Sequence, residues 1–139
     1  MKQVYVIEGA RTPFGTFGGS LRNVEVTELG KTATVAALER SGVSADMVDQ
    51  TFFGTVIFTS PSSPFLARHI SLKSGIPKSV PALTVNRLCG SGLQAVVSGV
   101  QSILSGESTC VVAGGAENMS QSPHVAWGLR FKPIKKGIP

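Results

Sequence analysis

Cys89 stands in a glycine-rich turn whose residue types could do covalent chemistry. It follows a short β-branched run and precedes a segment, Gly90 to Gly106, that carries no charge. A thiol at the start of a helix lies beside unpaired backbone N–H groups and the positive end of the helix dipole, and both favour the nucleophilic thiolate. Gly90 and Gly92 remove side chains from the approach, so that backbone amides at the turn could hold a developing oxyanion. The sequence therefore predicts that Cys89 is a nucleophile.

The same turn admits other interpretations. A free cysteine is often a small buried hydrophobe, and we expect that role for Cys110, which lies inside an apolar run. A dinucleotide-binding module is the runner-up for the turn, because Gly90-x-Gly92-x-x-Ala95 after a strand matches the G-x-G-x-x-A fingerprint.

That fingerprint requires an acid at the end of the next strand, about twenty residues on. Glu107 precedes the expected strand, and Glu117 follows the glycines that close it. The fingerprint also gives no role to a cysteine directly before its first glycine. We therefore keep the dinucleotide module as an alternative only.

Strand and helix patterns alternate along the chain. Apolar residues on both faces predict buried strands, and helical spacing between glycine or proline stops predicts helices. Such alternation is typical of a mostly parallel sheet with right-handed crossovers. It places the Cys89 turn at the carboxyl edge of the sheet, where open α/β sheets bind ligands. The expected strands are 3–8, 50–58, 81–85 and 108–115, and the expected helices are 27–40, 64–74 and the charge-free segment within 90–106.

The charge-free helix has two different sides. An apolar stripe runs along one side, and small residues lie on the other, where a helix facing water would normally carry Lys or Glu. Small residues permit close approach, so we expect this helix to be sandwiched between layers, one of which the chain does not obviously supply. The stripe comprises Leu93, Val96, Val97, Val100, Ile103 and Leu104, and the small side comprises Ala95, Ser98, Gly99 and Ser102.

Composition limits the class of protein. With 139 residues and 42% hydrophobic content, the chain can form one domain with a core. No apolar run approaches the ~20 residues of a membrane helix, so no membrane partner is expected. Two cysteines without metal or disulfide spacing indicate reduced thiols, and we expect a cytoplasmic protein. Four basic residues within 130–136 account for most of the net charge of +5; we expect a solvated loop there and no nucleic-acid partner.

Three stretches resemble the thiolases, the acyl-CoA:acetyl-CoA C-acyltransferases. The stretch VNRLCGSGLQAVVSG, around Cys89, resembles their nucleophile motif, VIEGARTPFGTFGGSL resembles their N-terminal strand and loop, and VVAGGAENMSQSPH resembles a later block. The matches keep the family's order across residues 6–124 and so cover nearly the whole chain. Ketoacyl synthases share the strand–Cys–helix arrangement, but the Asn-x-x-Cys-x-Ser-Gly form is thiolase-like.

The resemblance implies an α/β protein with the αβαβα layered fold, of which this chain supplies most of the N-terminal half. It implies that Cys89 accepts the acyl group of an acyl-CoA as a thioester, with the backbone of Cys89 and Gly90 supporting the oxyanion. Asn86, Ser91 and Gly92 would shape the nucleophile loop. Acetyl-CoA would be the second substrate of a Claisen condensation, and no cofactor is implied.

Several family features have no counterpart in the chain. The later catalytic histidine, the second catalytic cysteine and an Asn-containing motif are absent, and we expect His69 and His124 to be structural or solvent-facing. Residues 1–118 are expected to form an incomplete N-terminal domain, and residues 119–139 the truncated start of a substrate-binding segment, so that the chain alone is inactive. The family's dimers and tetramers imply self-association through the strand Ala82–Val85. A non-catalytic dimerising protein of the same fold is a further alternative.

Overall fold

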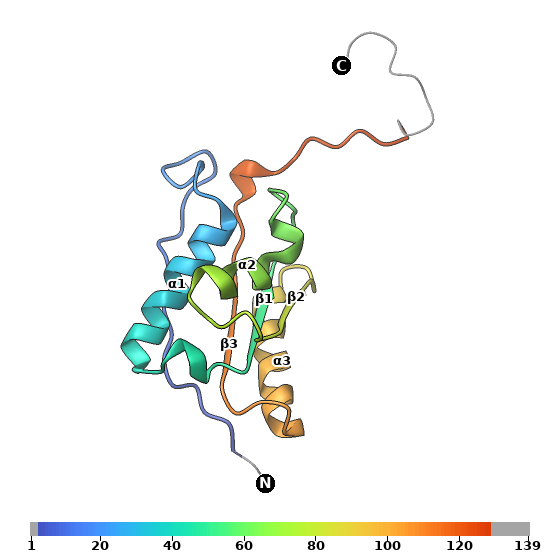
Figure 1. Cartoon of the computed structure of the whole chain (residues 1–139). Coiled ribbons are helices and arrows are strands. Elements are labelled where there is room, and N and C mark those ends of the chain that lie inside the picture. The colour runs from blue at the N-terminus through green and yellow to red at the C-terminus, as the bar shows by residue number, and fades with distance from the viewer. Residues whose placement is uncertain (1–2, 129–139) are drawn as a thin grey trace.

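A computed structural model describes residues 3–128, which form a three-stranded sheet with helices on both faces (Figure 1). Helices and strands alternate from the first helix to the last strand, apart from short 3-10 turns. The helices are α1 Val26–Ser41, α2 Leu66–Lys73 and α3 Ser91–Ser105, the strands are β1 Gln50–Gly54, β2 Ala82–Val85 and β3 Val111–Gly115, and the 3-10 turns are η1 Ala45–Met47, η2 Ser63–Phe65 and η3 Met119–Gln121.

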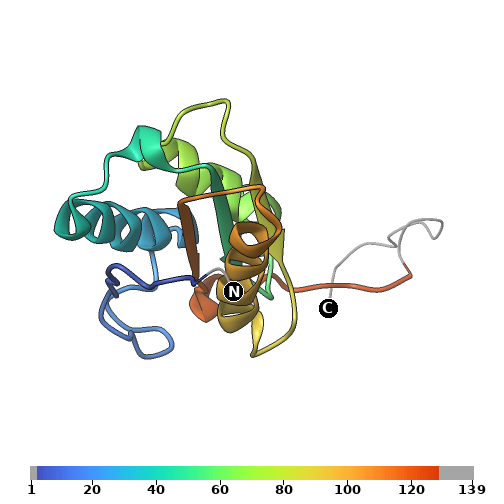
Figure 2. The ribbon, with the colours of Figure 1, turned by 90° about the horizontal axis from the view of Figure 1, so that it is seen from below.

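β1 is the central strand of the sheet, and β2 and β3 lie parallel to it on either side. Gly54 at the end of β1 is in register with Val85 of β2 and Gly115 of β3, so the three strands end together. α3 covers one face of the sheet, and α1 and α2 lie on the other (Figure 2). The parallel sheet confirms the class predicted from the alternation of elements.

Two adjacent phenylalanines show that both faces of β1 are covered. Phe53, 4% exposed, packs with side chains of α1 and α2, whereas Phe52, 5% exposed, lies near Gly99 of α3. Side chains alternate across a strand in this way, and a parallel sheet buries both of its faces. The cluster on the first face comprises Val26, Phe53, Leu66, Ala67 and Ile70, and a second cluster comprises Val48, Ile76 and Val80.

α3 packs on the sheet through its small residues. A Cβ on Gly99 would come within 2.9 Å of Val111 Cγ2, which shows how closely the helix approaches β3. Part of the apolar stripe faces outward, since Leu93 is 72% and Leu104 50% exposed, whereas Val100 and Ile103 are half-buried beside a cavity. The small side is thus the side on the chain's own sheet, and the stripe is the side that a further layer would cover. The helix ends at Gly106, whose φ of 86° is the left-handed conformation typical of a C-cap. The buried residues of α3 are Ser91, Ala95, Gly99 and Ser102.

The strand predicted for residues 3–8 is wrong. The segment has no strand pairing in the described part of the chain, and Tyr5, Val6 and Ile7 are 73%, 86% and 66% exposed. A strand needs a hydrogen-bonded neighbour as well as an apolar pattern. A cavity of about 700 Å³ is lined by this segment together with α1, α3 and β3.

Other boundaries shift for local reasons. α1 begins at Val26 after the N-cap Glu25, and Thr27, the predicted cap, is buried within the first turn. The first turn of the predicted second helix is the 3-10 turn η2. β1 ends at Gly54, earlier than predicted, because the amides of Val56 and Ile57 bond to a side chain described below instead of to a neighbouring strand.

Some predictions concern residues beyond those described. The basic residues of 130–136 and the end of the predicted substrate-binding segment lie outside residues 3–128. The domain boundary predicted at residue 118 stays a prediction. Among residues 3–128, no helix has both the length and the apolar character needed to span a bilayer.

Candidate active site

Cys89 lies in a turn of residues 86–91 between β2 and α3, called here the nucleophile turn, and its side chain is exposed. Gly90 N–H donates to the carbonyl of Arg87 at 3.1 Å, and Ser91 N–H donates to that of Leu88 at 3.0 Å. Leu88 has a φ of +52°, and it is the only non-glycine residue among residues 3–128 with a positive φ. A left-handed conformation costs such a residue on the order of 1 kcal/mol. Other contacts must therefore hold this turn in place.

Asn86 and Ser91 supply contacts from either side of the nucleophile turn. Asn86 Oδ1 accepts from the Leu88 amide at 3.0 Å. The Ser91 hydroxyl accepts from the Arg87 amide at 2.8 Å and donates to the Leu88 carbonyl at 2.6 Å. Side chain–backbone bonds of this kind fix tight turns. The structure thus places both predicted loop residues on the backbone that flanks Cys89.

The amide of Cys89 itself is available for a hydrogen bond. Within residues 3–128 no acceptor pairs with the Cys89 N–H, whereas the Gly90 N–H is used in the turn. Cys89 N–H, at the positive end of α3, is therefore the donor that a developing oxyanion could reach, and Gly90 supports the turn itself. A Cβ on Gly92 would meet no atom within 4 Å, so the approach on that side is open.

Glycines at the ends of two strands let α3 begin directly at the sheet edge. A Cβ on Gly115 of β3 would lie 3.1 Å from Gly92 Cα, and Gly54 of β1 approaches the backbone of Ser91 even more closely. Residues with side chains could not occupy these positions without displacing the start of the helix. The ends of β1 and β3 thereby determine how close to the sheet the nucleophile turn lies.

Glu117 is a site residue that sequence reasoning missed. It follows β3 by two residues and stands at the same sheet edge as the nucleophile turn. Its carboxylate accepts from the amides of Val56 at 2.8 Å and Ile57 at 3.3 Å, and from the Thr55 hydroxyl at 3.1 Å. The available signal is an acid just after the glycines that end a strand, but nothing in the sequence pattern indicates its partners, which precede it by about 60 residues.

The residues after Glu117 tie the same edge to the N-terminal loop. Asn118 Nδ2 donates to the carbonyls of Val24 at 2.7 Å and Leu21 at 3.2 Å. Ser120 Oγ accepts from the Gly18 amide at 2.9 Å. The segment after β3 thus holds two separate loops, one on each side of it.

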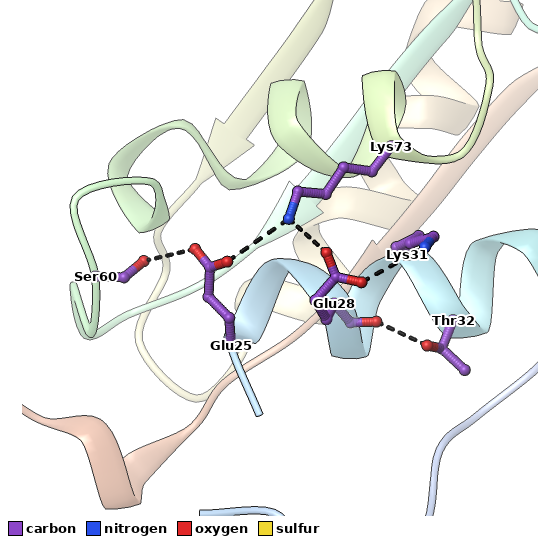
Figure 3. Close-up of polar contacts among 6 residues, drawn as sticks. All are labelled: Glu25, Glu28, Lys31, Thr32, Ser60 and Lys73. Carbon is purple, nitrogen blue, oxygen red and sulfur yellow. Dashed lines mark hydrogen bonds and ion pairs between the residues drawn. The ribbon is translucent and has the colours of Figure 1, made fainter. Parts of the chain in front are cut away.

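An ion-pair network joins α1 to α2 (Figure 3). Lys73 of α2 pairs with Glu25 at 3.6 Å and with Glu28, and Lys31 pairs with Glu28 at 3.5 Å. The Lys73 hydrogen bond lowers the pKa of Glu28, and Glu28 in turn raises the pKa of Lys73. Burial alone would raise the pKa of Glu25, but the charge of Lys73 and the hydrogen bond from the Ser60 hydroxyl help to lower it overall. The network links the two helices on the sheet face opposite α3.

Cys110 has a different environment from Cys89. It is half-buried just before β3, and burial together with the charge of Asp49 raises the pKa of its thiol. Asp49 Oδ2 accepts from the amides of Thr109 at 2.6 Å and Cys110 at 3.0 Å, and these bonds lower the pKa of Asp49. A raised pKa disfavours the thiolate, so this environment suits a structural cysteine.

The two histidines belong to other elements. His69 is in α2, on the sheet face opposite α3, and His124 is exposed after η3. No group of three or more potential metal ligands occurs in the part of the chain described, residues 3–128. A groove beside β2 and the cavity beside β3 are both lined by residues other than Cys89.

The geometry does not favour the dinucleotide alternative. The Glu117 carboxylate already accepts backbone amides, and Glu107 precedes β3. The glycines follow β2, which lies at the edge of the described sheet, whereas dinucleotides bind where strand order reverses within a sheet.

Comparison with protein families gives one matching model, "Thiolase, N-terminal domain", across residues 4–135. The human 3-ketoacyl-CoA thiolase, mitochondrial, is 45% identical over 131 residues, which cover 94% of this chain and 33% of that protein. Beta-ketothiolase BktB of Cupriavidus necator is 48% identical over 94% of this chain and 34% of its own length. The chain spans about a third of the length of these relatives.

Solved structures agree with the sequence matches. The crystal structure of human mitochondrial 3-ketoacyl-CoA thiolase in complex with CoA superimposes with a TM-score of 0.90 at 44% identity, covering 97% of this chain and 34% of that one. An acetyl-CoA acetyltransferase of Bacillus anthracis gives a TM-score of 0.87 at 36% identity, covering 96% of this chain and 34% of its own.

Proposed function

The chain belongs to the thiolase family, and we propose that the protein of which it forms part is an acyl-CoA:acetyl-CoA C-acyltransferase with Cys89 as its nucleophile. The similarities confirm the predicted fold class, the N-terminal part of the thiolase-like α/β fold. One observation carries the proposal for Cys89: an exposed thiol stands beside its own amide, which has no acceptor among residues 3–128, where a parallel strand ends and α3 begins.

The proposed reaction has two halves. The Cys89 thiolate attacks the carbonyl carbon of an acyl-CoA, and the oxyanion that forms accepts a hydrogen bond from Cys89 N–H. Collapse of this intermediate expels the CoA thiolate and leaves the acyl group on Cys89 Sγ. A base then removes a methyl proton from acetyl-CoA, and the carbanion attacks the thioester. The products are a 3-ketoacyl-CoA and the regenerated Cys89 thiolate; thiolysis is the reverse.

The base of the second half is proposed to come from the rest of the protein. His69 lies across the sheet from α3, and His124 is exposed beyond η3, so neither is placed beside Cys89. We propose that the chain alone does not turn over, and that CoA thioesters are substrates with no further cofactor. Steady formation of acetoacetyl-CoA by the isolated chain would contradict the proposal that the chain alone does not turn over.

Acyl transfer to Cys89 is directly measurable in the full-length protein. Brief incubation with radiolabelled acetyl-CoA, acid quench and proteolysis should leave the label on the peptide that contains Cys89. Cys89→Ser should lose the label and the condensation activity, whereas Cys110→Ser should keep both. Full condensation activity in Cys89→Ser would refute the assignment.

Assembly and location complete the proposal. We propose a homodimer or homotetramer formed through β2, an edge strand whose Leu83 is 52% exposed, because unpaired strand edges tend to pair. Sedimentation of the full-length protein with Leu83→Lys would test this surface. We propose a cytoplasmic location because both cysteines are free thiols. Cell fractionation would distinguish it from the mitochondrial location that the name of the human relative states.

A further inference from the structure

The carboxylate of Glu117 holds the loop that follows the central strand. Val56 N–H, Ile57 N–H and the Thr55 hydroxyl all donate to it, at 2.8, 3.3 and 3.1 Å. The three donors are consecutive residues, and Ile57 N–H reaches both carboxylate oxygens, the second at 3.4 Å. A carboxylate is suited to this arrangement because it only accepts and has two oxygens.

The loop held by Glu117 touches the nucleophile turn. Asn86 Nδ2 donates to the Val56 carbonyl at 3.4 Å, a long bond, while Asn86 Oδ1 accepts from the Leu88 amide at 3.0 Å. Leu88 is the residue with the left-handed φ, and it directly precedes Cys89. In addition, Thr55 N–H donates to the Val85 carbonyl at 3.2 Å, which joins the start of the loop to the end of β2.

We propose that Glu117 is a positioning residue for Cys89, acting through Val56 and Asn86. The carboxylate fixes the Val56 peptide, the Val56 carbonyl orients the Asn86 amide, and Asn86 holds Leu88 in the conformation that presents the Cys89 thiol and its N–H. Glu117 touches no reacting atom. The inference rests on the proposed function only in taking Cys89 as the reacting group.

A glutamine at this position has nearly the same shape but the wrong hydrogen-bonding pattern. Its NH2 group replaces one acceptor with a donor, which would face a backbone N–H of Val56 or Ile57. The loop must then shift or lose a bond to a charged acceptor. Glu39→Gln makes the same chemical change on the exposed surface of α1, where no partner of the carboxylate is found among residues 3–128, and serves as the matched control.

The experiment compares full-length wild type with Glu117→Gln, Glu117→Asp and Glu39→Gln. The first readout is the alkylation rate of Cys89 by iodoacetamide at fixed pH, with Cys110 as the internal reference. The second is the split between kcat and KM, and the third is thermal unfolding. We expect Glu117→Gln to slow Cys89 alkylation about fivefold relative to Cys110 and to lower kcat with little change in KM, an effect of the size seen for coupled neighbouring residues.

Glu117→Asp keeps the charge but shortens the reach, so it should restore part of the Cys89 rate. Glu39→Gln should match wild type in all three readouts. The proposal is overturned if Glu117→Gln unfolds at a lower temperature but, while folded, alkylates and turns over like wild type. It is equally overturned if Cys89 and Cys110 slow together. Should Glu117→Gln fail to fold, the same comparison between Glu117→Asp and wild type decides the question.

A double-mutant cycle of Glu117 and Asn86 tests whether the effect of Glu117 on Cys89 passes through Asn86. If the effect passes through Asn86, removing its side chain with Asn86→Ala should make a further Glu117→Gln change nearly silent toward Cys89 alkylation. Independent, additive effects would overturn the relay. Failure of the proposed function gives a different pattern: wild-type Cys89 would take no label from acetyl-CoA, while the alkylation comparison would still report on Glu117.

Discussion

Gly54, the last residue of β1, lies so close to the start of α3 that a Cβ placed on it would come within 2.7 Å of the Gly92 amide nitrogen. The atoms in the way belong to the backbone of α3, which cannot rotate aside as a side chain can. Gly54→Ala should therefore push the first turn of α3 away from the sheet edge, together with Cys89. We expect a loss of about 1–3 kcal/mol in unfolding free energy, as for other overpacked sites, and a slower Cys89 alkylation.

Gly99→Ala is the matched control for that prediction. Its added methyl would meet Val111 Cγ2 at 2.9 Å, a contact with a side chain and not with backbone, in the middle of α3. We expect it to cost stability while leaving the alkylation rate of Cys89 in the folded protein unchanged. If Cys89 alkylation slowed equally in both variants, the cause would be a general loosening of α3 and not the displacement of its first turn.

The two cysteines should react differently with thiol reagents. Cys89 is exposed, whereas Cys110 is half-buried and its thiol pKa is raised by burial and by the charge of Asp49. At neutral pH a smaller fraction of Cys110 than of an ordinary thiol is therefore thiolate. In the variants Cys89→Ser and Cys110→Ser, each of which keeps one of these two thiols, we expect iodoacetamide to modify Cys89 faster than Cys110. Faster modification of Cys110 would contradict the burial described here.

Lys73 should contribute to the docking of α1 on α2 in a salt-dependent way. It pairs with both Glu25 and Glu28, whereas Lys31 pairs only with Glu28 through an i,i+3 contact. Partly exposed pairs are weak and are screened by salt. We expect Lys73→Met to lower the urea midpoint slightly at low salt, Lys31→Met to lower it less, and high salt to remove the difference. A difference that persists in high salt would assign the effect to packing of the lysine stem.

The nucleophile turn could be predicted from the sequence because its signals are local. Glycines around Cys89, the β-branched run before it and the charge-free run up to Gly106 mark a strand, a turn and a helix without reference to distant residues. β2 and α3 form where those signals place them. The resemblance to the thiolases, and not these local signals, predicts Asn86 and Ser91. Their bonds within the turn reach only a few residues along the chain, but Asn86 also donates to the Val56 carbonyl, 30 residues earlier.

What could not be predicted depends on partners distant in sequence. The segment 3–8 has the alternation of a strand, but a strand also needs a neighbour, and the described residues offer none there. The sequence pattern suggests for Glu117 only the role of a dinucleotide acid, because its amide partners precede it by 60 residues or more. Which side of α3 packs on the sheet could not be predicted either, because both a side of small residues and a side of apolar residues can face a sheet.

Asp49 should make folding stability depend on pH. Its carboxylate accepts from the amides of Thr109 and Cys110, which lowers its pKa below the ordinary 3.8. A lowered pKa in the folded state stabilises the fold above the unfolded value, and that contribution is lost as the pH falls through the folded value. Asp49→Asn should therefore unfold at a lower temperature than wild type at neutral pH, and the gap should close in acid. Asp46→Asn is the control, because it removes a carboxylate charge whose bond is an exposed one from the Ser44 hydroxyl. A gap that stays constant into acid would mean that the Asp49 charge contributes nothing to folding.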